Sequence, residues 1–157
     1  CFSGLASPTV FVSVRHRNHL GVMAGSAVTL TNAGATVDYS TTTLHGTHAD
    51  TTINSVRALR AGDVNSNSNL IFDGANSDAT LIINTVMDNP ANTFLGGSHS
   101  FPYTNIYSTR DVNMNGTIIF DGANSDATEI LNNVMGHPAN TFLGGSRSYT
   151  QILEQLP

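Results

Sequence analysis

The pattern of apolar and polar positions divides the chain near residue 60. Before that point, short runs rich in β-branched residues lie at residues 9–14, 27–31, 35–39 and 41–45, the last of which is either a fourth short strand or an extended edge. Alternation of this kind is typical of half-buried strands, and glycine-containing turns separate the runs. Residues 51–60 have no clear period, and we expect them to pack the β-rich part against residues 61–157. The pattern predicts a β-rich domain over residues 1–60.

Residues 63–110 and 111–157 are two copies of one unit, offset by 48 positions. Each copy predicts a polar loop, a short extended piece and a helix. The positions that predict the helix are Leu81, Ile82, Thr85 and Val86 in the first copy, and Ile130, Leu131, Val134 and Met135 in the second. We expect Asn76 or Asp78, and Asn124 or Asp126, as the N-caps, and a stop before Pro90 and Pro138. Neither copy buries its helix face alone, so residues 61–157 should form a paired tandem repeat.

Oxygen-bearing side chains recur at positions 1, 3 and 5 of each loop, with an apolar residue at position 8. This spacing wraps a short loop around a hard cation, and Ca²⁺ takes about six to eight oxygen ligands. Gly122 stands where a loop of about twelve residues would place its closing carboxylate, so an insertion leaves Asn124 and Asp126 to close the site. The expected ligands are Asp63, Asn65, Asn67, Asn69, Asn76 and Asp78 in the first loop, and Asp111, Asn113, Asn115, Thr117 (through its carbonyl), Asn124 and Asp126 in the second.

The two loops differ at the turn, where the first has Ser68 and the second has Gly116. A positive φ costs a serine about 1 kcal/mol. Each ion would meet two firm carboxylates, which predicts about two bound Ca²⁺ with dissociation constants on the order of 10⁻⁴ M. Asp121 could cap the insertion or hold a second ion, and we favour the cap; the sequence does not assign a role to Asp73.

Composition agrees with a metal-dependent extracellular protein. Lysine is absent, the net charge is −5, and the loops contain most of the aspartates. The chain has no basic stretch, which argues against nucleic acid. No apolar run approaches the roughly 20 residues that span a bilayer. Cys1 is the only cysteine and could be lipidated, form an intermolecular disulfide or simply begin the sequence.

The segment from Asp111 to Asp126, DVNMNGTIIFDGANSD, resembles dockerin-like calcium repeats at the C-terminal ends of secreted bacterial surface proteins. Residues 12–23 and 154–157 resemble segments that flank those repeats. The resemblance implies a calcium-binding region with a structural or cell-surface role. It implies as ligands Asp63, Asn65, Asn67, Asp78, Asp111, Asn113, Asn115 and Asp126. Ser68 and the asparagines at position 5 depart from the common Asp-Gly pair.

Other chemistry has weaker support. His16 and His19, like His45 and His48, have a spacing that could hold zinc, but residues three apart on a strand point to opposite faces. The chain has no Gly-x-Ser-x-Gly elbow and no phosphate-loop lysine, and no pair of glutamates suggests glycosidase chemistry. We therefore expect no enzyme activity.

About four strands are too few for a sandwich of about seven, so residues 1–60 predict a partial Ig-like sandwich with an open edge. A second copy of the chain could add a strand to that edge. The sequence favours a calcium-binding subunit of a bacterial surface fibre or filament. The alternative is a binding or anchoring module for a protein or glycan partner.

Overall fold

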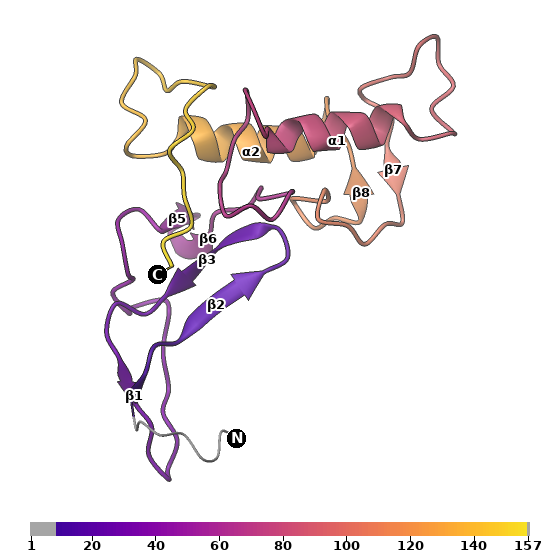
Figure 1. The fold of residues 1–157 in the computed structure, drawn as a ribbon. Helices are drawn as coiled ribbons and strands as arrows, with labels where there is room; N and C mark the ends of the chain where they lie inside the picture. Colours follow the sequence, from indigo (N-terminus) through magenta and orange to yellow (C-terminus); the bar gives the residue numbers. More distant parts are fainter. Residues whose placement is uncertain (1–8, 157) are drawn as a thin grey trace.

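The computed structural model describes residues 9–156, so Cys1 lies outside the described residues. These residues form short antiparallel strand pairs and two short helices, which makes the fold mainly β with short helices (Figure 1). The elements are β1 Thr9–Val10, β2 Ser13–His16, β3 His19–Met23, β4 Val28–Thr29, β5 Asp50–Ile53, β6 Val56–Leu59, α1 Asp78–Met87, β7 Tyr103–Thr104, β8 Thr117–Ile118 and α2 Asp126–Met135. No described helix is long and apolar enough to cross a membrane.

The strands of residues 9–156 pair two by two, as β1–β4, β2–β3, β5–β6 and β7–β8. The β5–β6 hairpin turns at Asn54 and Ser55, whose φ angles are 50° and 65°. Two consecutive left-handed residues are the requirement of a type I′ turn, which matches the twist of a hairpin. The sequence pattern of residues 51–60 does not predict this hairpin.

Several predicted strands need correction. The run at residues 9–14 is divided between β1 and β2, and the run at 27–31 shortens to β4. The predictions at 35–39 and 41–45 are wrong, apart from a single bridge between Ala24 and Leu44. The Arg57 guanidinium donates to the carbonyl oxygens of Tyr39 (3.1 Å) and Thr42 (2.6 Å). A side chain therefore takes carbonyl oxygens that a strand ladder would use.

The two helices end where the sequence predicts but begin on different caps. Ser77 and Ser125 are the N-caps, and their Oγ atoms accept the N–H groups of Thr80 and Thr128 at 3.2 Å. Ser77 Oγ also donates to the carbonyl of Phe72 at 2.6 Å. The expected caps at Asn76 or Asp78, and at Asn124 or Asp126, are wrong because a hydroxyl can both accept and donate here.

The core lies where the two repeats meet. Helices α1 and α2 pack together, and the loops that follow them project from opposite ends of the pair (Figure 1). The buried helix positions correspond under the 48-residue offset: Ala79, Ile82 and Val86 in α1, and Ala127, Ile130 and Val134 in α2. Burial of each of these larger aliphatic side chains contributes roughly 1.5–3 kcal/mol, so the pairing supplies a large part of the core.

Each repeat also lends a segment to the other. In the first repeat, the Ile106 N–H donates to the Gly116 carbonyl at 3.3 Å, beside the β7–β8 pair. In the second, the Glu154 N–H donates to the Ser68 carbonyl at 2.8 Å. These contacts correspond under the 48-residue offset. The segment after α1 therefore lies on the second loop, and the segment after α2 lies on the first.

Candidate metal centre

The first aspartate of each loop organises the turn around its side chain. Asp63 is 7 % exposed, and its two carboxylate oxygens accept the N–H groups of Asn67 (3.0 Å) and Ser68 (3.1 Å). Asp111 accepts the corresponding N–H groups of Asn115 and Gly116, both at 3.0 Å. The loops therefore curl around a carboxylate in the same way in both copies.

The asparagines at positions 3 and 5 of each loop also accept main-chain N–H groups through their side-chain oxygens. The Oδ1 atom of Asn65 accepts the Asn67 N–H at 3.0 Å, and that of Asn67 accepts the Asn69 N–H at 2.9 Å. The second loop repeats these contacts from Asn113 to Asn115 (3.1 Å) and from Asn115 to Thr117 (2.8 Å). Asn and Asp favour such local turns because the side-chain oxygen replaces a main-chain acceptor.

Ser68 and Gly116 both adopt positive φ angles, of 63° and 80°. The position that the sequence identifies as a sharp turn is therefore left-handed in both loops. Ser68 carries the cost of a β-carbon there, and its hydroxyl donates to Glu154 Oε2 at 3.0 Å.

The closing aspartates are the most buried part of the site. Asp78 is 0 % exposed; its Oδ1 accepts the N–H groups of Val64 (2.9 Å) and Asn65 (3.3 Å), and its Oδ2 accepts that of Ile71 (2.9 Å). Asp126 repeats the three bonds with Val112 (2.7 Å), Asn113 (3.2 Å) and Ile119 (2.9 Å). Each carboxylate therefore ties both ends of its loop to the start of a helix. Two oxygens have about four lone-pair directions, so three N–H donors leave room for one cation contact.

We call the four buried aspartates Asp63, Asp78, Asp111 and Asp126, with the N–H groups that they accept, the frame. The remaining expected ligands lie around this frame. Asn76 and Asn124 have φ angles of 60° and 58°, and their carbonyl oxygens accept the side-chain N–H groups of Asn65 (3.0 Å) and Asn113 (2.8 Å). Asn69 Oδ1 is buried without a hydrogen-bond partner. Asp73 and Asp121 are exposed and lie outside the frame: Asp73 accepts the Ser148 hydroxyl at 3.4 Å. The capping role that we favour for Asp121 falls instead to Ser125, whose hydroxyl donates to the Phe120 carbonyl; Ser77 makes the corresponding bond to Phe72 in the first loop.

Three of the four buried aspartates form no ion pair with another described residue. None of the ion pairs within residues 9–156 includes Asp63, Asp78 or Asp126. Burial raises the pKa of Asp78 to about 7 and that of Asp126 to about 6, although main-chain N–H donors act to lower both. Burial also raises the pKa of Asp63. A carboxylate that is buried without a counterion favours the binding of a cation or a proton.

The donor set fits a hard cation better than a soft one. No three His, Cys, Asp or Glu side chains within residues 9–156 form a group that could hold a metal ion. Each loop instead offers two carboxylates together with amide and main-chain oxygens, which are ligands of Ca²⁺. The partnerless Asn69 oxygen adds one acceptor to the first loop.

The surroundings of the two loops differ in charge. Beside the first loop, the buried carboxylate of Glu154 binds Ser68 and forms an ion pair with Arg15 at 3.1 Å. Beside the second loop, Arg17 Nη2 lies 3.6 Å from Asp111 Oδ2, and the guanidinium stacks 4.0 Å from the centre of the Tyr107 ring. The sequence pattern identifies neither Glu154 nor Arg17 as part of a site, because both lie far from the loops along the chain.

The two histidine pairs behave differently from each other. The β2–β3 turn places His16 opposite His19, with their Nδ1 atoms 2.9 Å apart. The expectation that these rings face opposite sides of a strand is therefore wrong, because a turn separates them. His45 instead contacts the Gln155 carbonyl, and His48 packs edge-on against His137.

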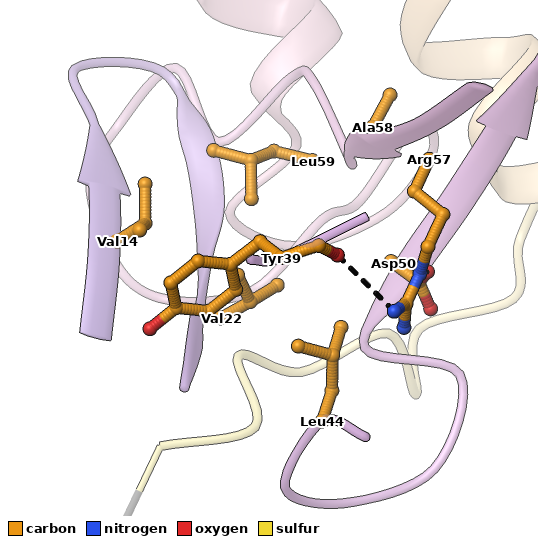
Figure 2. Close-up of a pocket in the computed structure, with 8 residues that line it drawn as sticks. All are labelled: Val14, Val22, Tyr39, Leu44, Asp50, Arg57, Ala58 and Leu59. Atoms are coloured by element: carbon orange, nitrogen blue, oxygen red, sulfur yellow. Dashed lines mark hydrogen bonds and ion pairs between the residues drawn. The ribbon is translucent and has the colours of Figure 1, made fainter. Parts of the chain in front are cut away.

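A small apolar groove lies between the β2–β3 and β5–β6 hairpins. Its volume is about 170 Å³. Figure 2 shows the side chains of Val14, Val22 and Leu44 near the Tyr39 ring, with the Arg57 contact to the Tyr39 carbonyl beside them. Arg57 also pairs with Asp50 at 2.6 Å, so the charges at this groove are already neutralised.

No protein-family model, curated protein or solved structure matches this chain.

Proposed function

We propose that this chain is an extracellular calcium-binding structural protein with two dockerin-like loop–helix repeats, each binding one Ca²⁺. The observation that carries the proposal is the repeated set of four buried carboxylates, of which Asp63, Asp78 and Asp126 have no ion-pair partner among the described residues. Asp63 and Asp78, with the oxygens of Asn65, Asn67, Asn69 and Asn76, would hold the first ion. The corresponding second set is Asp111, Asn113, Asn115, Thr117, Asn124 and Asp126. Bound Ca²⁺ supplies the positive charge that the buried carboxylates lack, so it stabilises the fold and has no catalytic role.

The two sites should differ in affinity. Glu154 adds negative charge beside the first loop, and the Arg17 guanidinium competes with a cation for Asp111 in the second. Solvent screens a charge near a partly buried site less than it screens an exposed charge. The negative charge of Glu154 and the positive charge of Arg17 should therefore change ion binding more than exposed charges would. We therefore assign the tighter site to the first loop, despite the strained turn at Ser68.

Calorimetric titration tests this assignment. Wild-type protein should bind two Ca²⁺, with the tighter step lost in Asp63→Ala and the weaker step lost in Asp111→Ala. Asp73→Ala, which removes an exposed carboxylate outside the frame, is the matched control and should retain both steps. Absence of calcium binding in the folded wild-type protein would overturn the proposed function.

Self-assembly is the second part of the proposal. The supporting observation is the combination of two-stranded sheets with exposed apolar side chains on or next to the strands, namely Phe11, Val14, Ile53 and Val56. Open strand edges pair readily with other chains. In this proposal residues 1–60 are a partial Ig-like sandwich, which a strand from a second copy completes. Repeated head-to-tail addition gives a filament at the bacterial cell surface.

Electron microscopy of the purified chain, with calcium present, tests assembly. We expect filaments from the intact chain and none from a variant lacking residues 1–14, because that deletion removes β1 and part of β2. The shortened variant should still bind calcium in both loops. A monodisperse monomer of the intact chain at high concentration would contradict the proposed assembly without affecting the calcium proposal.

The alternative function is a binding or anchoring module for a protein or glycan partner. It is favoured by two exposed Phe-Leu pairs at corresponding loop positions. Leu95 and Leu143 are 94 % and 97 % exposed, and Phe94 and Phe142 lie beside them. The amides of Asn92 and Asn140 each make three main-chain hydrogen bonds that fix these loops. Fixed, exposed apolar side chains are a feature of contact surfaces.

A further inference from the structure

Three polar atoms converge at the turn between β2 and β3. The Nδ1 atoms of His16 and His19 lie 2.9 Å apart, and Asn18 Oδ1 lies 3.2 Å from the first and 2.8 Å from the second. The three atoms therefore form a nearly equilateral triangle.

The orientation of Asn18 is fixed by its other contacts. Its side chain is 0 % exposed, and Nδ2 donates to the carbonyl oxygens of Thr109 (3.0 Å) and Asp111 (2.8 Å). A flipped amide would place an oxygen against two carbonyl oxygens, so Oδ1 must face the histidines. The junction between the two repeats thus holds the oxygen in place for the hairpin.

Hydrogen bonding alone does not satisfy this triangle. Asn18 Oδ1 can only accept, and each Nδ1 carries at most one hydrogen. If both rings are protonated at Nδ1, two N–H groups face each other across 2.9 Å. If only one is protonated, the other nitrogen directs its lone pair at the Asn18 oxygen. Three pairs of atoms share at most two hydrogens, so every tautomer leaves at least one pair without a hydrogen bond.

A metal ion satisfies all three atoms at once. With metal–ligand bonds of about 2.1 Å, neighbouring donors of an octahedral ion lie about 3.0 Å apart, and those of a tetrahedral ion about 3.4 Å apart. Two of the observed separations, 2.8 and 2.9 Å, are close to the octahedral value, and the third, 3.2 Å, lies between the octahedral and tetrahedral values. His16 is exposed, so solvent can reach the positions opposite that face.

We propose that His16 Nδ1, Asn18 Oδ1 and His19 Nδ1 form a facial binding site for a divalent first-row transition-metal ion such as Zn²⁺, with water at the open positions. Imidazole nitrogens favour this class of ion over Ca²⁺, which prefers oxygen ligands. The neighbouring Arg17 opposes a cation, but its charge is shared with Asp111 and the Tyr107 ring. The site shares no ligand atom with the calcium loops, although Asn18 also donates to the Asp111 carbonyl, and it does not depend on the proposed function.

Zn²⁺ titration of the full chain tests the site. Excess Ca²⁺ keeps Zn²⁺ from the loops, and a Cys1→Ser background removes the only thiol. We expect one Zn²⁺ per chain, with binding at least about 10-fold weaker in His16→Ala and in His19→Ala. His45→Ala is the matched control, because it removes an exposed histidine that contacts only a carbonyl, and it should leave binding unchanged.

Nitrogen-15 NMR of the imidazole rings, in protein that keeps all of its histidines, identifies which ring nitrogens bind the metal. Zn²⁺ should shift the Nδ1 resonances of both His16 and His19, while those of His45 stay in place. Absence of Zn²⁺ binding, or binding that His16→Ala leaves unchanged, would overturn the site. Metal-induced shifts at Nε2 rather than Nδ1 would also overturn it.

Discussion

Replacing Asp78 with alanine should destabilise the fold even when calcium is absent. The substitution removes the acceptor of three main-chain N–H groups, from Val64, Asn65 and Ile71. A buried donor left without a partner costs about 1–3 kcal/mol, so we expect a total loss on the order of 3–5 kcal/mol. Urea denaturation in the presence of a chelator measures this loss directly.

Two further variants make the comparison specific. Asp126→Ala removes the corresponding three bonds in the second repeat and should cost a similar amount. Asp73→Ala removes an exposed carboxylate and should change the free energy of unfolding by less than about 0.5 kcal/mol. If chelator-treated Asp78→Ala were as stable as wild type, the closing aspartate would serve the ion alone.

Chelation should lower the melting temperature strongly at pH 8 and weakly at pH 5. Calcium at a hundred times its dissociation constant stabilises the fold by about 2.7 kcal/mol per site. For two sites in a domain of this size, removal corresponds to a drop of roughly 10–20 °C. Thermal melts with and without EDTA, with metal content measured in parallel, give the difference at each pH.

The pH dependence follows from the raised pKa values of Asp78, about 7, and Asp126, about 6. Without calcium, the folded chain holds protons on these carboxyls at a pH where the unfolded chain has lost them. The calcium-free fold is therefore more stable near pH 5 and loses stability, on the order of a few kcal/mol, as the pH rises through 6 and 7. Melting in EDTA that does not change between pH 5 and 8 would contradict this account.

The repeats could be predicted from the sequence because their information is local. Both helices, their ends before Pro90 and Pro138, and the left-handed turns at Ser68 and Gly116 follow from residue types close in sequence. The paired helix faces follow from the apolar period at the same local scale. Local preference and tertiary structure agree in these segments.

The features that sequence analysis did not find depend on distant contacts or on side-chain competition. In place of the predicted strand pairing at 35–39 and 41–45, the carbonyls of Tyr39 and Thr42 accept hydrogen bonds from Arg57. Arg17 and Glu154 contact loop residues that are far from them in the sequence, so a short sequence motif cannot reveal these contacts. The contact between His16 and His19 depends on a hairpin turn, which β-branched composition alone does not position.

The exchange of segments between the repeats has a consequence for the order of folding. Glu154 reaches Ser68 across 86 positions, so the first loop cannot acquire that neighbour until the ribosome has synthesised the second repeat. Residues 103–106, which lie on the second loop, are synthesised before it. During vectorial synthesis the second loop thus emerges with its partner already present, while the first must wait. The first repeat is therefore synthesised first, but it acquires its last contacts only after the second repeat has been synthesised.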